Sequence, residues 1–264
     1  FQSRPDVPVA VTEPLAMQTQ LAPKYQGTAD GQAAEAILRK CVHCGFCTAT
    51  CPTYQLLGDE LDGPRGRIYL MKQVLEGEKP TRKTQQHLDR CLSCRNCEST
   101  CPSGVQYGHL LDIGRKLVDA QVPRPASERA VRWALKEGLP SPLFAPAMAM
   151  GQLARPLLPR ALKDKVPTKR AGGAWPTRHH ARKVLMLAGC VQPSMSPNIN
   201  SATARVLDAA GIQTVIAPKA GCCGAVKFHL NDQDGGKAQM RANIDAWWPA
   251  IEQGVEGIVM NASG

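Results

Sequence analysis

Eight of the eleven cysteines in this chain of 264 residues fall in two runs with the same spacing. The first run contains Cys41, Cys44, Cys47 and Cys51, and the second contains Cys91, Cys94, Cys97 and Cys101. Each run reads C-x2-C-x2-C-x3-C-P, and the second follows the first by 50 residues. Two-residue gaps allow three thiolates to converge on one iron–sulfur cluster from a tight loop. The pattern therefore predicts electron transfer through iron–sulfur centres.

In two-cluster ferredoxins with this spacing, the fourth cysteine of each run binds the other cluster. We therefore predict two 4Fe–4S clusters whose ligands cross between the runs. The first set is Cys41, Cys44, Cys47 and Cys101. The second set is Cys91, Cys94, Cys97 and Cys51.

Eight cysteines could also serve as a disulfide scaffold or as zinc ligands. A disulfide scaffold is typical of short secreted chains, and this longer chain shows no convincing secretory signal. Two four-cysteine zinc sites would more often separate C-x2-C pairs by a longer loop. A duplicated run of three cysteines plus a fourth before proline favours clusters over both alternatives.

Charged and imidazole side chains lie close to the two runs. His43 stands inside the first run and His87 precedes the second. Histidine can ligate a cluster or tune its potential, but four cysteines per cluster favour a supporting or surface role. Arg65, Arg67 and Arg95 could offset the negative charge of thiolate-bound clusters.

The remaining cysteines are Cys190 and the pair Cys222 and Cys223, which Gly224 follows. Adjacent thiols do not readily close a disulfide with each other. Three thiolates at one place could hold a metal, an unusual cluster or a redox-active thiol site. They could equally be small buried apolar residues, and the pattern alone does not decide between these readings.

Helices are expected to deliver the chain to both cysteine runs. Apolar periodicity predicts helices over 30–40, 67–76, 81–90 and 106–121, with Thr81 as an N-cap. Glycines and a proline predict a turn-rich loop over 58–66. We therefore expect a helical two-cluster domain over residues 29–122, preceded by a disordered leader over 1–28 in which Met17 could be the natural start.

A second domain is expected over residues 183–264. Short apolar runs predict strands over 184–188, 214–217 and 257–260, and helices are predicted over 198–210, with Asn198 as cap, and 233–252. Strand, helix, strand, helix, strand indicates an open α/β unit with right-handed crossovers. Cys190 then falls at the carboxyl edge of a strand, where such sheets bind ligands. The predicted fold class is α+β overall.

Residues 123–182 form a proline-rich connection with short helices predicted over 127–137 and 146–153. Nine of the ten charged residues over 155–183 are Lys or Arg, within a chain of net charge +10. A basic segment rich in proline and glycine is read either as a solvated linker or as a contact for an acidic partner or membrane surface. Nucleic acid is not expected, because no recognition module accompanies the charge.

Composition restricts the compartment. No stretch approaches the roughly 18 apolar residues of a membrane span, and the start of the chain lacks the features of a signal peptide. Eleven cysteines without such a signal predict a reducing compartment, hence the cytoplasm, with peripheral contact to the inner face of the membrane as an option.

Three stretches resemble the glycolate oxidase iron–sulfur subunits. These are CVHCGFCTATCPTYQLLGDELDGPRGR from Cys41, GCCGA from Gly221 and NIDAWWP from Asn243. The spacing of Cys190 from Cys222 and Cys223 also resembles the start of a CCG cysteine-rich domain. The resemblance covers nearly the whole chain from Met17.

The resemblance implies an electron-transfer subunit of a glycolate-oxidising dehydrogenase. A partner subunit would carry FAD and oxidise glycolate, and electrons would pass through two 4Fe–4S clusters towards the quinone pool. This chain has no glycine-rich nucleotide fingerprint after a strand, which agrees with flavin on a partner. The family continues through further cysteines and a second CCG copy, so the chain is expected to be an N-terminal fragment with an incomplete CCG site at Cys190, Cys222 and Cys223.

Two other functions are compatible with the same cysteine pattern. The same module could serve a lactate or an anaerobic glycerol-3-phosphate dehydrogenase. A zinc-binding interaction protein without enzymatic function is the alternative of a different class.

Overall fold

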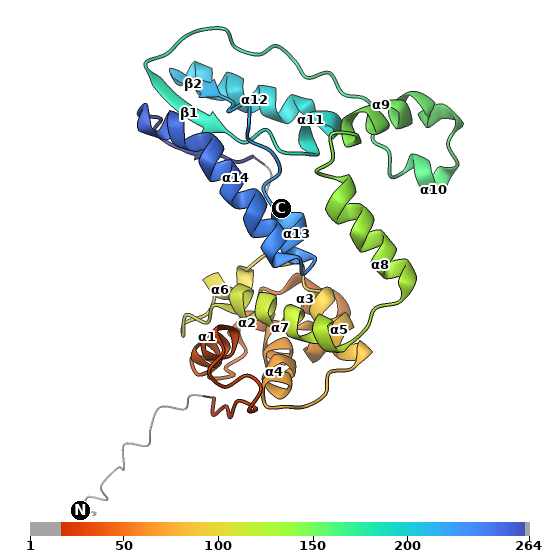
Figure 1. The fold of residues 1–264 in the computed structure, drawn as a ribbon, viewed down its shortest axis with the longest axis vertical. Helices are drawn as coiled ribbons and strands as arrows, with labels where there is room; N and C mark the ends of the chain where they lie inside the picture. Colours follow the sequence, from red (N-terminus) through yellow and green to blue (C-terminus); the bar gives the residue numbers. More distant parts are fainter. Residues whose placement is uncertain (1–16, 262–264) are drawn as a thin grey trace, which may run out of the picture. The chain divides into compact units, whose positions relative to one another are not determined.

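The structure is a computed structural model, and it describes residues 17–261. The chain divides into two compact units, the first ending at Arg124 and the second starting at Pro125. Within the described residues the first unit is helical, and the second combines helices with a parallel sheet (Figure 1). The predicted α+β class, with a helical part followed by an α/β part, is confirmed.

Four longer helices build the first unit. They are α1 (Ala29–Leu38), α4 (Pro64–Leu75), α5 (Arg82–Asp89) and α7 (Tyr107–Gln121). Short elements lie between them: α2 (Phe46–Ala49), α3 (Pro52–Leu57), the 3-10 turn η1 (Glu60–Asp62) and α6 (Asn96–Ser99). The core is formed where α4 and α7 meet, around side chains that are at most 2% exposed, namely Leu38, Ile68, Met71, Leu75, Leu88, Leu110 and Leu111.

Capping and close packing fix where the helices begin. Thr81 caps α5 as predicted, since its side chain accepts from the Thr84 amide and the Thr84 side chain accepts from the Thr81 amide. Gly66 lies in the first turn of α4 directly against η1, and a Cβ there would stand 2.1 Å from the Glu60 carbonyl oxygen. This close approach holds the start of α4, which carries Arg65 and Arg67.

The expected leader over 1–28 is only partly within the described residues. Residues 1–16 lie outside them. Residues 17–28 differ from the expectation, because Tyr25 is buried in the core and the Ala22 amide donates to the Leu75 carbonyl. Apolar side chains at Met17, Leu21 and Tyr25 explain this packing, since their burial stabilises the segment on the helical core.

The second unit contains three strands among the described residues. They are β1 (Arg182–Met186), β2 (Ile212–Val215) and β3 (Ile258–Val259). Its helical elements are α8 (Ala126–Trp133), the π-helical η2 (Ala134–Gly138), α9 (Phe144–Ala154), η3 (Arg155–Leu157), α10 (Arg160–Lys163), α11 (Gln192–Met195), α12 (Pro197–Ala209), α13 (Ala225–His229) and α14 (Gln233–Glu252). None of the described helices has the length and apolar composition needed to cross a bilayer.

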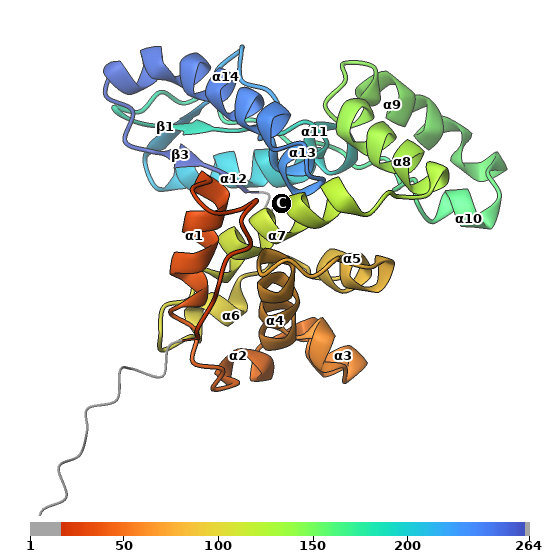
Figure 2. The same ribbon diagram turned by 60° about the horizontal axis from the view of Figure 1, so that its bottom comes forward.

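The sheet is parallel with strand order β2-β1-β3. Leu185 in the central strand pairs with Val215 on one side and Ile258 on the other, and it is fully buried. Helices α12 and α14 lie on opposite sides of the sheet (Figure 2). A continuous apolar strand is what a sheet covered on both faces requires, which is why the apolar runs identified these strands.

The basic connection is packed on its own unit in part. Between α10 and β1 the described chain has no helix or strand, yet Ser201 of α12 donates to the Gly172 carbonyl oxygen. Asp208 of the same helix accepts from His180 at 2.8 Å and pairs with Arg178 at 2.8 Å. The later half of the expected linker is therefore attached along α12.

Candidate iron–sulfur centres

The two cysteine runs adopt matching backbone conformations. His43 and Ser93 occupy equivalent positions with φ of 53° and 54°. Gly45 and Arg95 also correspond, with φ of 86° and 58°, and each precedes a four-residue helix. Left-handed conformations cost a non-glycine residue roughly 1–2 kcal/mol, so the surrounding packing must hold Arg95 in place. The two loops thus bend in the same way.

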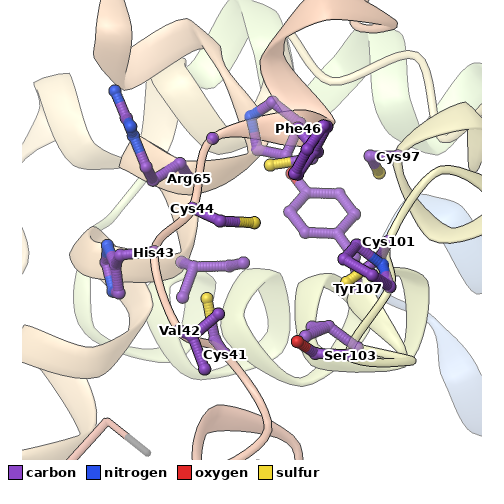
Figure 3. Close-up of a pocket in the computed structure, with 16 residues that line it drawn as sticks. Cys41, Val42, His43, Cys44, Phe46, Arg65, Cys97, Cys101, Ser103 and Tyr107 are labelled. Atoms are coloured by element: carbon purple, nitrogen blue, oxygen red, sulfur yellow. The ribbon is translucent and has the colours of Figure 1, made fainter. Parts of the chain in front are cut away.

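The first of two hollows, which we call the first pocket, is shown in Figure 3. Its lining includes the cysteines Cys41, Cys44, Cys47, Cys97 and Cys101. The sulfur atoms of Cys41, Cys44 and Cys101 point into this space, although Cys101 comes from the other run (Figure 3). Apolar and aromatic neighbours, among them Phe46, Ile68 and Tyr107, complete the lining.

The second pocket is lined by the cysteines Cys51, Cys91, Cys94 and Cys97. Cys51 comes from the first run, so both pockets are lined by cysteines of both runs. The second pocket has the four cysteines of the predicted second set, and the first pocket has those of the predicted first set together with Cys97. The assignment of ligands to clusters stays a prediction. Cys97 and Tyr107 line both pockets, which places the two hollows next to each other.

The protonation of these cysteines bears on whether the pockets suit a metal cluster. Burial raises the pKa of the Cys47 thiol to about 11 and of the Cys97 thiol to about 12. All eleven cysteines are free. Metal binding requires thiolates, so loading the pockets would displace these protons. Each hollow is lined by at least four free cysteines, which fits the ligand requirement of a 4Fe–4S cluster.

An arginine fixes each cysteine loop. Arg65 packs so closely on Gly45 that a Cβ at Gly45 would lie 2.8 Å from its Nη1 atom. Arg115, buried on α7, donates to the Cys91 carbonyl at 2.8 Å and to Ser93 Oγ at 3.2 Å. These contacts hold the two loops in position. The role of Arg115 was missed from the sequence, because only the fold brings it to residues 88–93.

Arg67 and His87 meet at a buried carboxylate that the sequence did not single out. Asp62 is 1% exposed and pairs with Arg67, His87 and Arg90, at 3.4, 3.1 and 2.8 Å. Burial acts to raise the pKa of Asp62, but hydrogen bonds from His87 and Arg90 outweigh it and hold the pKa below its usual value. Arg67, fully buried, lines the second pocket. His87 therefore supports the structure through Asp62.

The other residues proposed near the clusters lie at the rims of the pockets. Arg65 lines the first pocket, and Arg95 lines the second. Burial and the neighbouring Arg65 lower the pKa of His43, which favours the neutral imidazole. Its ring lies on the opposite side of the loop from the Cys41 and Cys44 sulfur atoms (Figure 3).

The remaining cysteines come together in the second unit. Cys190 follows β1, and Cys222 and Cys223 precede α13. A hydrogen bond from Cys222 outweighs burial and lowers the pKa of Cys190 to about 7. Asn243 of α14 fixes the loop, because its side chain accepts from the Gly221 amide and donates to the Cys222 carbonyl, both at 2.8 Å. The structure thus brings these three thiols to one place.

Comparison with known families agrees with this division. Residues 37–105 match the family described as "4Fe-4S dicluster domain", and residues 184–264 match the family described as "Cysteine-rich domain". The chain therefore has one segment similar to a dicluster iron–sulfur domain and one similar to a cysteine-rich domain. As a whole it is similar to glycolate oxidase iron–sulfur subunits.

Two curated relatives carry that name. The chain is 60% identical to the "Glycolate oxidase iron-sulfur subunit" of Escherichia coli (strain K12), over 94% of this chain and 61% of the relative. It is 32% identical to the "Probable glycolate oxidase iron-sulfur subunit" of Bacillus subtilis (strain 168), over 87% of this chain and 58% of the relative. The chain thus spans about three fifths of the length of these relatives. No solved structure matches it.

Proposed function

We propose that this chain is the electron-transfer part of a glycolate-oxidising dehydrogenase and carries two 4Fe–4S clusters. The observation that supports this most strongly is the pair of adjacent pockets, each lined by at least four cysteines drawn from both runs. The homology to glycolate oxidase iron–sulfur subunits supplies the substrate class.

In this proposal Cys41, Cys44, Cys47 and Cys101 hold one cluster, and Cys91, Cys94, Cys97 and Cys51 hold the other. When bound, such clusters accept and release single electrons. The protein holds the thiols in fixed loops through Arg65 and Arg115 and surrounds them with apolar side chains that limit water. Arg67 adds a buried positive charge beside the second pocket, where it favours a negatively charged group.

The substrate chemistry is assigned to a partner. A separate FAD-containing subunit would oxidise glycolate to glyoxylate, and this chain would pass the two electrons on singly. The quinone pool is the proposed acceptor. The electrons would leave towards this acceptor through the cysteine-rich domain, which contains Cys190, Cys222 and Cys223.

We also propose a place in the cell. A reducing compartment is implied by the free cysteines, so we assign the chain to the cytoplasm. The basic residues between Arg155 and Lys183 would favour contact with the anionic inner face of the membrane. Such contact would bring the complex close to its quinone acceptor.

Reduction by substrate tests the proposed function. The chain, produced with its FAD-containing partner subunits and purified without oxygen, is mixed with glycolate, lactate or glycerol 3-phosphate and frozen for EPR. Glycolate should produce the signals of reduced clusters, while the other two should not. If only lactate or only glycerol 3-phosphate reduces the clusters, the chain belongs to a different dehydrogenase.

Cysteine variants test the crossed ligand sets. Replacing Cys51 by alanine should leave the same residual EPR signal as replacing Cys91, because both belong to the second pocket. Replacing Cys101 should give the same residual signal as replacing Cys41. If the Cys51→Ala spectrum instead matches that of Cys41→Ala, each run binds its own cluster.

A further inference from the structure

The two pockets differ in the hydroxyl groups that reach their sulfur atoms. In both loops a backbone N–H serves the first cysteine, from His43 to Cys41 and from Ser93 to Cys91. Side-chain hydroxyl contacts to sulfur are found at Cys91 and Cys51, which both line the second pocket. The pockets therefore differ although their loops match.

Tyr107 provides one of these contacts from the start of α7. Its side chain is buried, with 3% of the residue exposed, and its hydroxyl donates to Cys91 Sγ at 3.6 Å. A tyrosine hydroxyl has an ordinary pKa of about 10, so it is protonated at neutral pH and can donate this hydrogen bond.

The sequence repeat shows that this donor has no counterpart. The residue 50 positions before Tyr107 is Leu57, which has no hydroxyl and is exposed. Thr53, the other contact, lies 3.2 Å from Cys51 Sγ but also donates to the Asp62 carbonyl oxygen at 2.8 Å. Either Thr53 or Cys51 could donate in the 3.2 Å contact, and Thr53 gives its hydrogen to the Asp62 carbonyl, so Tyr107 is the better-defined donor.

We propose that Tyr107 sets the order in which the two clusters take electrons, by making the cluster of the second pocket the more readily reduced. This inference rests on the proposed function. Reduction adds one electron and makes the cysteine sulfur atoms more negative, without forming or breaking a bond. A hydrogen bond to sulfur stabilises the reduced state more than the oxidised state, and it does so more strongly in a buried site.

The positive charge nearby acts in the same direction. Arg67 is fully buried and lines the second pocket, where its Nη1 atom donates to Thr53 Oγ1 at 3.1 Å. Arg65, at the first pocket, is more than a third exposed and is paired with Glu60 at 2.7 Å. Each arginine is paired with a carboxylate, Arg65 with Glu60 and Arg67 with Asp62, but solvent weakens the field of Arg65 more than that of the buried Arg67. Arg67 is a positioning residue here, since it reaches Cys51 through Thr53.

The test is an EPR-monitored redox titration with dithionite as the electron donor. The whole chain and its Tyr107→Phe variant are purified without oxygen, and iron and sulfide are measured first. The second-pocket signal, recognised by its loss in Cys91→Ala, should appear first in the unchanged chain. In Tyr107→Phe the ratio of reduced to oxidised second-pocket cluster should fall about tenfold at a given potential. This corresponds to a reduction potential lower by roughly 59 mV for one electron.

Two controls separate the hydroxyl from general effects. Tyr69→Phe removes a hydroxyl from an exposed tyrosine on α4 and should leave both potentials unchanged. Replacement of all four tyrosines by 3-fluorotyrosine keeps the ring at position 107 and makes the phenol a stronger donor. It should shift the second-pocket potential upwards, opposite to Tyr107→Phe.

The outcomes distinguish this inference from the proposed function. An unchanged chain without iron and sulfide would overturn the proposed function. If both clusters are present but the first-pocket signal appears first, the inference alone is overturned. The same holds if the second-pocket potential does not shift in Tyr107→Phe. If Tyr107→Phe does not retain its cluster, the fluorotyrosine protein decides, and an unshifted second-pocket potential there also overturns the inference.

Discussion

Replacing Arg67 by methionine should destabilise the first unit strongly. Arg67 is fully buried and donates to the His87 carbonyl at 2.7 Å, to Thr53 Oγ1 at 3.1 Å and to Asp62 Oδ1 at 3.4 Å. Methionine occupies similar space but removes all three bonds and the positive charge. Breaking a buried ion pair costs about 3–5 kcal/mol because the other charge remains buried.

The expected loss for Arg67→Met lies near the lower limit of that range. Asp62 keeps Arg90 at 2.8 Å and His87 at 3.1 Å, so its carboxylate is not left alone. We therefore expect a loss of about 3 kcal/mol. With a urea dependence of about 1–3 kcal/mol per M, the unfolding midpoint should fall by about 1–3 M. Circular dichroism of anaerobic samples with equal iron content measures this midpoint.

Arg90→Met is the matched control, because Arg90 pairs with the same carboxylate from the surface. The Arg90 side chain is 51% exposed, and exposed ion pairs contribute about 1 kcal/mol or less. Its midpoint should therefore fall much less than that of Arg67→Met. Equal midpoints for the two variants would refute the view that Arg67 is the buried centre of this network.

Two further predictions concern other parts of the chain. Gly66→Ala should lower the free energy of unfolding by about 1–3 kcal/mol, because the new Cβ would meet the Glu60 carbonyl. Gly138 has open space around it, so Gly138→Ala should leave the same free energy unchanged. Cys190 has a pKa lowered to about 7, so its reaction with iodoacetamide should have a midpoint near pH 7. Cys223 should react only at higher pH, because its hydrogen bond to Cys222 and its burial raise its pKa. Mass spectrometry of the labelled peptides measures this order, and earlier labelling of Cys223 would contradict the hydrogen-bond geometry.

Elements with strong local patterns could be predicted from the sequence. Helix α14 spans Gln233–Glu252 as predicted, and the apolar runs correctly indicated three parallel strands. Boundaries were less accurate where capping decides them. Helix α12 begins after Ser196, two residues before the expected cap Asn198.

Features that depend on tertiary contacts could not be predicted in this way. The helices α2 and α6 have four residues each, too few for a periodic pattern, and a left-handed residue rather than apolar spacing starts them. Tyr107, Asp62 and Arg115 are single polar residues in ordinary sequence contexts. Their importance arises only when the fold brings them to the cysteine loops.

Metal and sulfide content tests the central claim most directly. The chain is purified without oxygen, and its iron, acid-labile sulfide and zinc are measured together with the EPR spectrum of the reduced protein. Two 4Fe–4S clusters predict about eight irons and eight sulfides per chain, with EPR signals of two interacting clusters. Stoichiometric zinc without iron or sulfide would contradict the account, and the two pockets would then be structural zinc sites.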